Sequence, residues 1–272
     1  MAFGPWLVRL ADTGPVAAGF WRLSLALPFL WLLARAAGQP VRWPGWWLAI
    51  AIAGAAAFFA ADLGAWHAGI RLTKLGNATL FGNFASFAFA AYGLWIARKW
   101  PSHLQAAALA LAAAGCAALM AGSAELSARH LRGDMLALAA GLLYTGYLII
   151  VERVRGTLQP LPILFLASLV GACLLLPASL ALGEQVMPAD WLPLFVLAFT
   201  SQLIGQSLLV FALGHVPPLI VGLALLTQPA ISAFIGWLAY GETLTALDWV
   251  GAFAIGIALV LVRLRSGPGA PN

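Results

Sequence analysis

The stretch LLTQPAISAFIGWLAYGETLTALDWVGAFAIGIALVLV, residues 225–262, holds two long apolar runs separated by a short polar break at residues 241–243. A transmembrane helix needs about 20 mostly apolar residues to cross a bilayer. The same pattern runs through the chain of 272 residues, of which 63% are hydrophobic and 8% are charged. Because soluble domains usually carry about 25% charged residues, the sequence predicts an integral membrane protein.

Nine apolar stretches of this kind lie between short polar breaks. They cover residues 15–36, 46–69, 75–97, 103–122, 133–152, 161–182, 191–213, 217–240 and 246–264. Backbone groups in lipid must form hydrogen bonds within the protein, and no stretch alternates with the period of two that a barrel strand requires. We therefore expect an all-α integral membrane protein.

The chain repeats itself at an offset of 145 residues. At this offset Pro15 meets Pro160, Gly38 meets Gly183, Trp46 meets Trp191 and Gly69 meets Gly214. Each copy holds five helices, and because five is odd, the second copy must enter the membrane from the opposite side. Inverted repeats are typical of secondary transporters, whose substrate site lies between the copies near the bilayer midplane. We expect a first repeat over 1–122, an inter-repeat loop over 123–132, a second repeat over 133–265 and a flexible tail over 266–272.

Residues 1–11 are apolar but too short to span a bilayer. Under the repeat they align with the second half of the fifth full helix. We interpret them as the remnant of a first helix, truncated by a late start site, in a fold of ten helices. The alternative is a short re-entrant or interfacial segment.

The basic residues predict the orientation in the membrane, because loops rich in Lys and Arg stay cytoplasmic. With a cytoplasmic C-terminus, eight of them lie inside: Arg35, Arg42, Arg98, Lys99, Arg153, Arg155, Arg263 and Arg265. Four lie outside: Arg71, Lys74, Arg129 and Arg132. The imbalance favours a cytoplasmic C-terminus. The net charge of +5 then reflects topology and gives no indication of nucleic-acid binding.

Three segments carry a family resemblance. In residues 225–262 a helix with a central Pro229 ends in Gly241-Glu242, and a final helix follows after a short turn. The segments GFWRLSLALPFL (19–30) and AWHAGIRLTKLGNATL (65–80) add an aromatic-arginine pair, Trp21-Arg22, and a helical turn. Together these resemble the EamA-type domain of the drug/metabolite transporter superfamily. The first copy departs from the pattern, with Phe84 and Ala97 where the second has Pro229 and Glu242.

The resemblance implies an EamA-like fold of two five-helix bundles in the inner membrane. It also implies a carrier of small metabolites, commonly an exporter, with both termini cytoplasmic.

Four polar side chains are expected at one depth in the membrane. Asp62 precedes the turn near Leu72 by ten residues, or about 15 Å of helix, and Asn83 returns to that depth on the next helix. In the second copy Gln206 and Gln228 flank the turn near Pro217 in the same way. An ionisable group inside a span costs about 2.5 to 3.5 kcal/mol, so Asp62 in particular requires a partner, a wet cavity or a function.

Helical spacing adds neighbours to these four. Trp66 follows Asp62 by four residues, Gln202 precedes Gln206 by four, and Tyr144 and Tyr147 are three apart. Ser232 lies beside the expected helix break at Pro229, whose ring frees carbonyl groups of the preceding turn. With Arg22, we expect a substrate site formed by Arg22, Asp62, Trp66, Asn83, Tyr144, Tyr147, Gln202, Gln206, Gln228 and Ser232.

Two roles are open for the charged residues. Arg22 and Asp62 either form a buried structural ion pair, or bind substrate and couple transport to protons through Asp62. His67 is expected to be structural rather than functional, because it lies near the outer end of its helix.

No enzyme motif is present: the chain lacks H-E-x-x-H, G-x-S-x-G, a P-loop and any Cys or His cluster at ligand spacing. We therefore expect neither catalysis nor a metal or cofactor. The sequence favours a transporter of a small-molecule substrate such as an amino acid, working by alternating access in the bilayer as a monomer or homodimer. The alternatives are a non-transporting scaffold or lipid-handling protein on the same fold and, less favoured, a passive channel.

Overall fold

The computed structural model describes residues 3–73, 75–98, 100–121, 128–240 and 245–263, without the side chains of some helical residues. The described part is helical and contains no strand. The first half comprises α1 (Gly4–Leu10), α2 (Pro15–Ser24), α3 (Leu27–Ala36), α4 (Trp46–Leu72), α5 (Leu75–Gly82), α6 (Phe84–Ala97) and α7 (His103–Ala121). The second comprises α8 (Ala128–Arg155), α9 (Pro160–Ala181), α10 (Leu192–Leu197), a π-helix (Ala198–Gln206), α11 (Ser207–Leu213), α12 (Pro218–Leu225), α13 (Thr227–Tyr240) and α14 (Ala246–Arg263).

The protein is a multi-pass membrane protein. Within the described residues, six helical stretches are long and apolar enough to span a bilayer: Pro15–Ala36, Trp46–Leu72, Asn77–Ala97, His130–Arg155, Pro160–Ala181 and Leu192–Leu213. α12 with α13, α7 and α14 supply the other three predicted spans. Large apolar side chains face outward, as lipid permits, including Trp47 at 87% exposure. α8 begins at Ala128, within the stretch expected to form the inter-repeat loop.

Prolines account for two interruptions within the spans. A proline ring clashes with the carbonyl group four residues before it. α2 ends at Ser24, four residues before Pro28, and α12 ends at Leu225, four residues before Pro229. A third interruption falls at Asn83, between α5 and α6. Three spans are therefore pairs of short helices rather than single rods.

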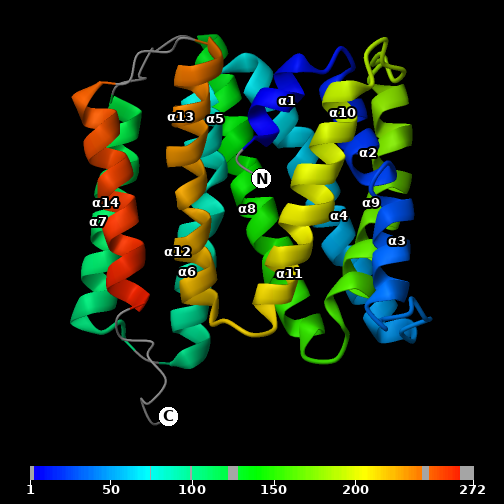
Figure 1. The fold of residues 1–272 in the computed structure, drawn as a ribbon, viewed down its shortest axis with the longest axis horizontal. Coiled ribbons are helices and arrows are strands. Elements are labelled where there is room, and N and C mark those ends of the chain that lie inside the picture. Colours follow the sequence, from blue (N-terminus) through cyan, green and yellow to red (C-terminus); the bar gives the residue numbers. More distant parts are fainter. Residues whose placement is uncertain (1–2, 74, 99, 122–127, 241–244, 264–272) are drawn as a thin grey trace.

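The two halves form inverted five-helix repeats. α3, α6, α8, α11 and α14 all end at the lower end of the bundle in Figure 1, whereas α1, α4, α9 and α13 end at the upper end. Counterpart spans pack on one another across the repeat: α2 lies against α9 and α7 against α14, and in the spans α5–α6 and α12–α13, α6 lies against α12 and α5 against α13. The central claim of an all-α inverted-repeat fold is confirmed.

One arginine was not counted in the predicted distribution of basic residues. Arg9 donates to the carbonyl oxygen of Thr73 at 3.0 Å, which places it at the upper end, the side expected to lie outside. The cytoplasmic position of the C-terminus stays a prediction.

Small residues allow close approach of α8 to the first repeat. A Cβ atom at Gly69 would lie 2.9 Å from the Gly133 carbonyl oxygen, and one at Gly141 would lie 2.9 Å from that of Gly82. Packing between transmembrane helices depends on such contacts, because lipid is as apolar as the helices. α8 therefore lies close to α4 and α5, which carry several of the candidate site residues.

Hydrogen bonds to two carboxylates, those of Glu184 and Asp12, join the repeats at the upper end. The Glu184 carboxylate accepts hydrogen bonds from the backbone N–H groups of Val16 and Ala17 at 3.3 and 2.9 Å. It therefore caps the N-terminus of α2, where a negative charge is favourable. Asp12 accepts from the backbone N–H groups of Ala189 and Asp190 at 2.7 and 3.2 Å. These bonds fix the entrance of α2, the helix that carries Arg22.

Candidate functional site

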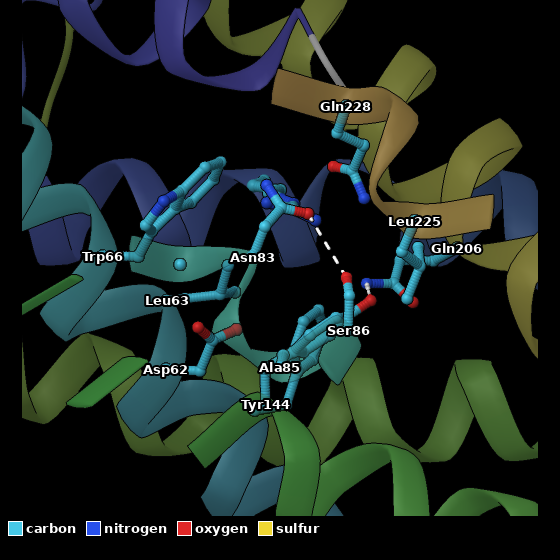
Figure 2. A pocket seen from close by; sticks show the side chains of 13 residues that line it. Asp62, Leu63, Trp66, Asn83, Ala85, Ser86, Tyr144, Gln206, Leu225 and Gln228 are labelled. Carbon is cyan, nitrogen blue, oxygen red and sulfur yellow. Dashed lines mark hydrogen bonds between the residues drawn. The ribbon is translucent and has the colours of Figure 1, made fainter. Parts of the chain in front are cut away.

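A pocket lies between the repeats where the interrupted helices meet (Figure 2). The space between its atoms amounts to about 540 Å³, including the part that is open to the surroundings. α2, α4, the α5–α6 junction, α8, the π-helix and the α12–α13 junction contribute its walls. The lining residues are Arg22, Phe59, Asp62, Leu63, Trp66, Gly82, Asn83, Ala85, Ser86, Tyr144, Gln206, Leu225 and Gln228.

Arg22 is the cationic group of this pocket and is 4% exposed. Its Nε donates to Gln202 Oε1 at 3.2 Å, and Gln202 Nε2 in turn donates to Ser168 Oγ at 3.0 Å. The guanidinium also lies over the ring of Phe59, 5.8 Å from its centroid, a favourable cation–π arrangement. A neutral amide and an aromatic face therefore hold the cation in position without neutralising it.

Asp62 is the anionic group and is 8% exposed. It forms no salt bridge with Arg22 in the described structure, although both residues line the same pocket. Its carboxylate accepts no hydrogen bond from the described residues and lies at the pocket wall (Figure 2). Arg22 and Asp62 thus line one pocket without neutralising each other. A ligand that carries a positive and a negative group could pair with both.

Asn83 and Gln228 lie at the helix interruptions of the two repeats. Asn83 Nδ2 donates to the Thr79 carbonyl oxygen at 2.6 Å, and its Oδ1 accepts from Ser86 Oγ at 3.5 Å. Gln228 enters from the opposite side of the pocket in Figure 2, and its amide has no hydrogen-bond partner among the described residues. The interruptions therefore bring amide groups from both repeats to one pocket.

The tyrosine pair divides between the pocket and the core. Tyr144 lines the pocket and accepts a hydrogen bond from Gln206 Nε2 at 3.1 Å, whereas Gln206 Oε1 is buried without a described partner. Tyr147 lies behind the pocket, stacked on Phe59 at 4.6 Å, and its buried hydroxyl has no described partner. Tyr147 supports the wall rather than lining it, and Gln202 likewise acts behind Arg22.

Trp66 forms an apolar wall. Its Nε1 donates to the Ala78 carbonyl oxygen at 3.3 Å. A Cβ atom at Gly82 would lie 2.9 Å from that nitrogen, so glycine at this position leaves room for the indole ring.

Seven of the ten residues expected to bind substrate line the pocket: Arg22, Asp62, Trp66, Asn83, Tyr144, Gln206 and Gln228. The side chains of Ser232 and Pro229 lie outside the described structure, as do Gly241 and Glu242. Phe59 also lines the pocket and was missed by sequence reasoning; it is three residues from Asp62, so helical spacing could have found it. His67 does not line the pocket; its Nδ1 lies 3.0 Å from the Pro15 carbonyl oxygen.

The described residues contain no group of three or more His, Cys, Asp or Glu side chains that could hold a metal ion. The chemistry of the pocket is that of two opposite charges, amides, a phenol and aromatic faces. Such groups bind and orient a ligand.

Comparisons with known proteins indicate a small-molecule transporter. Residues 131–264 match the EamA-like transporter family. The threonine/homoserine exporter RhtA of Escherichia coli (strain K12) is 29% identical over 133 residues, covering 48% of this chain and 45% of the exporter. The exporter of the same name from Salmonella typhimurium (strain LT2) gives the same values. The chain thus matches less than half the length of these curated relatives.

A solved crystal structure shares the fold. It has a TM-score of 0.78 and 14% sequence identity, with 98% of this chain and 96% of that chain aligned. At this identity the likeness concerns the fold alone.

Proposed function

Because residues 131–264 belong to the EamA-like transporter family, we propose that the chain is a secondary transporter of small zwitterionic metabolites such as amino acids. The observation that carries this proposal is the pair of opposite charges, Arg22 and Asp62, that line one pocket without forming a salt bridge. The relatives named as threonine/homoserine exporters support the same substrate class and the direction of export.

Electrostatics explains why a zwitterion suits this pocket. A buried charge is costly unless it is paired, and each of these two has room for a pairing group. A substrate carboxylate binds Arg22, and the substrate ammonium group binds Asp62. The amides of Asn83 and Gln228 then donate to or accept from a polar substrate side chain, while Trp66 and Phe59 contact its apolar part.

Transport would proceed by alternating access of the two repeats in the cell inner membrane. The interruptions at Asn83 and before Pro229 divide two spans at the level of the pocket, so that the half-helices on either side can tilt separately. Asp62 would take up a proton when the substrate ammonium group leaves, which couples transport to protons. The C-terminus would be cytoplasmic, because the basic residues concentrate at that end.

A scaffold without transport activity would have no need of unpaired charges at a pocket. Cysteine substitution of Ser86, which lines the pocket, offers a check. Labelling of Ser86→Cys by a water-soluble thiol reagent supports a carrier, and protection from both sides of the membrane supports a scaffold.

Binding by the purified chain tests the substrate class. Threonine should raise the thermal midpoint of the chain in a concentration-dependent way. 1-Amino-2-propanol lacks the carboxylate and 3-hydroxybutyrate lacks the ammonium group, so each should bind at least tenfold more weakly. Equal stabilisation by either analogue would contradict recognition of both charges, and a set of amino acids without any effect would contradict the substrate class.

A further inference from the structure

A second hollow lies at the lower end of the bundle, away from the central pocket. It is formed by the last turns of α6 and α8 and by Arg98, Trp100 and Pro101. It encloses about 1390 Å³, including the side that opens to the surroundings. Leu94 and Ile96 contribute apolar surface, and Trp95, Trp100, Arg98 and Arg153 complete its walls.

Two exposed arginines line this hollow. Arg98 has no hydrogen-bond or ion-pair partner among the described residues. Arg153 donates from Nε to the Tyr92 hydroxyl at 3.2 Å, which orients the guanidinium and leaves its terminal nitrogens unpaired in the described structure. Glu152 is the nearby acidic residue, but its carboxylate accepts from the same hydroxyl at 3.4 Å and does not line the hollow. The hollow is therefore cationic.

The backbone at Arg98 adds a further observation. Arg98 follows the last residue of α6 with φ of 49°, a left-handed conformation that glycine adopts most readily. Any side chain with a Cβ atom is disfavoured in this conformation; the backbone N–H group of Arg98 donates to the Trp95 carbonyl oxygen at 3.2 Å, but the guanidinium forms no described hydrogen bond or ion pair. A ligand that binds the guanidinium would offset this cost.

The aromatic residues indicate the surroundings of the hollow. Trp95 is 74% exposed and Trp100 is 95% exposed, as is typical of residues at the level of lipid headgroups. Tryptophans that serve only as anchors at the membrane interface would need neither neighbouring arginines nor a hollow between the helices. Basic pockets between transmembrane helices are, by contrast, suited to anionic headgroups.

We propose that this hollow binds an anionic phospholipid of the leaflet at the C-terminal end of α14. The phosphate group pairs with Arg98 and Arg153, one acyl chain follows Leu94 and Ile96, and the tryptophan rings flank the headgroup. The site is independent of the proposed transport function, since none of its residues lines the central pocket.

Native mass spectrometry of the full chain, purified in detergent and titrated with phosphatidylglycerol or phosphatidylcholine, tests this site. The variant pair is Arg98→Gly with Arg153→Gln. Glycine suits the left-handed backbone, so folding is preserved at that position. The matched control is Arg42→Gln, which removes an exposed arginine outside the hollow.

The wild type and Arg42→Gln should retain one more phosphatidylglycerol than the double variant. The double variant should require roughly tenfold more of this lipid for the same occupancy, because each arginine contributes to headgroup attraction. Phosphatidylcholine should be retained equally by all three proteins, and free inorganic phosphate should not displace the bound lipid. Equal phosphatidylglycerol retention in the double variant would overturn the proposal, as would displacement by free phosphate. Arg98→Gly alone gives the same test if Arg153→Gln fails to fold.

Discussion

Replacing Gln202 by leucine should expose how Arg22 is held. Gln202 is fully buried and bonds both the Arg22 guanidinium and the Ser168 hydroxyl, at 3.2 and 3.0 Å. Leucine has a similar volume, so the change removes hydrogen bonds without opening a large cavity. It leaves a buried cation and a buried hydroxyl without their described partner.

The expected loss of stability follows from these two bonds. A hydrogen bond to a charged group contributes about 1.5 to 3 kcal/mol and a neutral one about 1 kcal/mol. Gln202→Leu should therefore destabilise the protein by about 2 to 4 kcal/mol, which lowers the thermal midpoint by roughly 5 to 10 °C. Arg22→Met with Gln202→Leu should recover part of this loss, because it removes the buried charge together with its partner.

Thermal unfolding in detergent, followed by tryptophan fluorescence, measures these differences. Gln185→Leu is the matched control, since Gln185 is exposed in a loop and should shift the midpoint very little. A Gln202→Leu protein as stable as the control would refute the view that Gln202 holds Arg22. Simple additivity in the double variant would refute the coupling between the two residues.

Three further predictions, one of them with a matched control, have defined outcomes. Gly222→Ala places a Cβ atom 2.5 Å from the Ser86 carbonyl oxygen and should lower the free energy of unfolding by about 1 to 3 kcal/mol. Thermal unfolding measures this loss. Gly256→Ala is the control, because its Cβ atom meets nothing within 4 Å, and it should be neutral or stabilising. Hydrogen bonds from the backbone N–H groups of Ala189 and Asp190 lower the pKa of Asp12, so its stabilising effect is complete above the ordinary pKa near 3.9 and is lost as pH falls through the lower folded value. Asp12→Ala should therefore lower the thermal midpoint at pH 7 but not at acid pH, and an equal loss at both would contradict this role. Asp62→Asn should leave the fold intact, lower transport in proteoliposomes and remove the pH dependence of the transport that remains; an unchanged pH profile would exclude Asp62 as the coupling group.

The fold was largely predictable because its determinants are simple. The length of each apolar run gives the spans, and the offset between Pro15 and Pro160 gives the inverted repeat. The break before Pro28 was not predicted, although a proline acts on the turn before it and the sequence could have indicated it. The π-helix at Ala198–Gln206 was not predicted. In a π-helix each backbone hydrogen bond spans five residues instead of four, and tertiary packing decides where this happens.

The sequence predicted the depth of the candidate site residues in the membrane better than the direction in which their side chains point. Counting residues from the turns placed Asp62, Asn83, Gln206 and Gln228 at one level, and all four line the pocket. Spacing did not separate Tyr144 from Tyr147, since residues three apart share a helix face only broadly and the neighbouring helices decide which side chain they cover. Participation of these residues in substrate binding stays a prediction.

Counterflow in proteoliposomes tests most directly whether a zwitterionic substrate moves through the pocket between Arg22 and Asp62. Vesicles loaded with unlabelled amino acid should accumulate the labelled form when they contain the wild-type chain, well above protein-free vesicles. Asp62→Ala and Arg22→Met should each reduce this accumulation at least tenfold. Accumulation no higher than in protein-free vesicles for every amino acid tested, or full activity in both variants, would contradict the account.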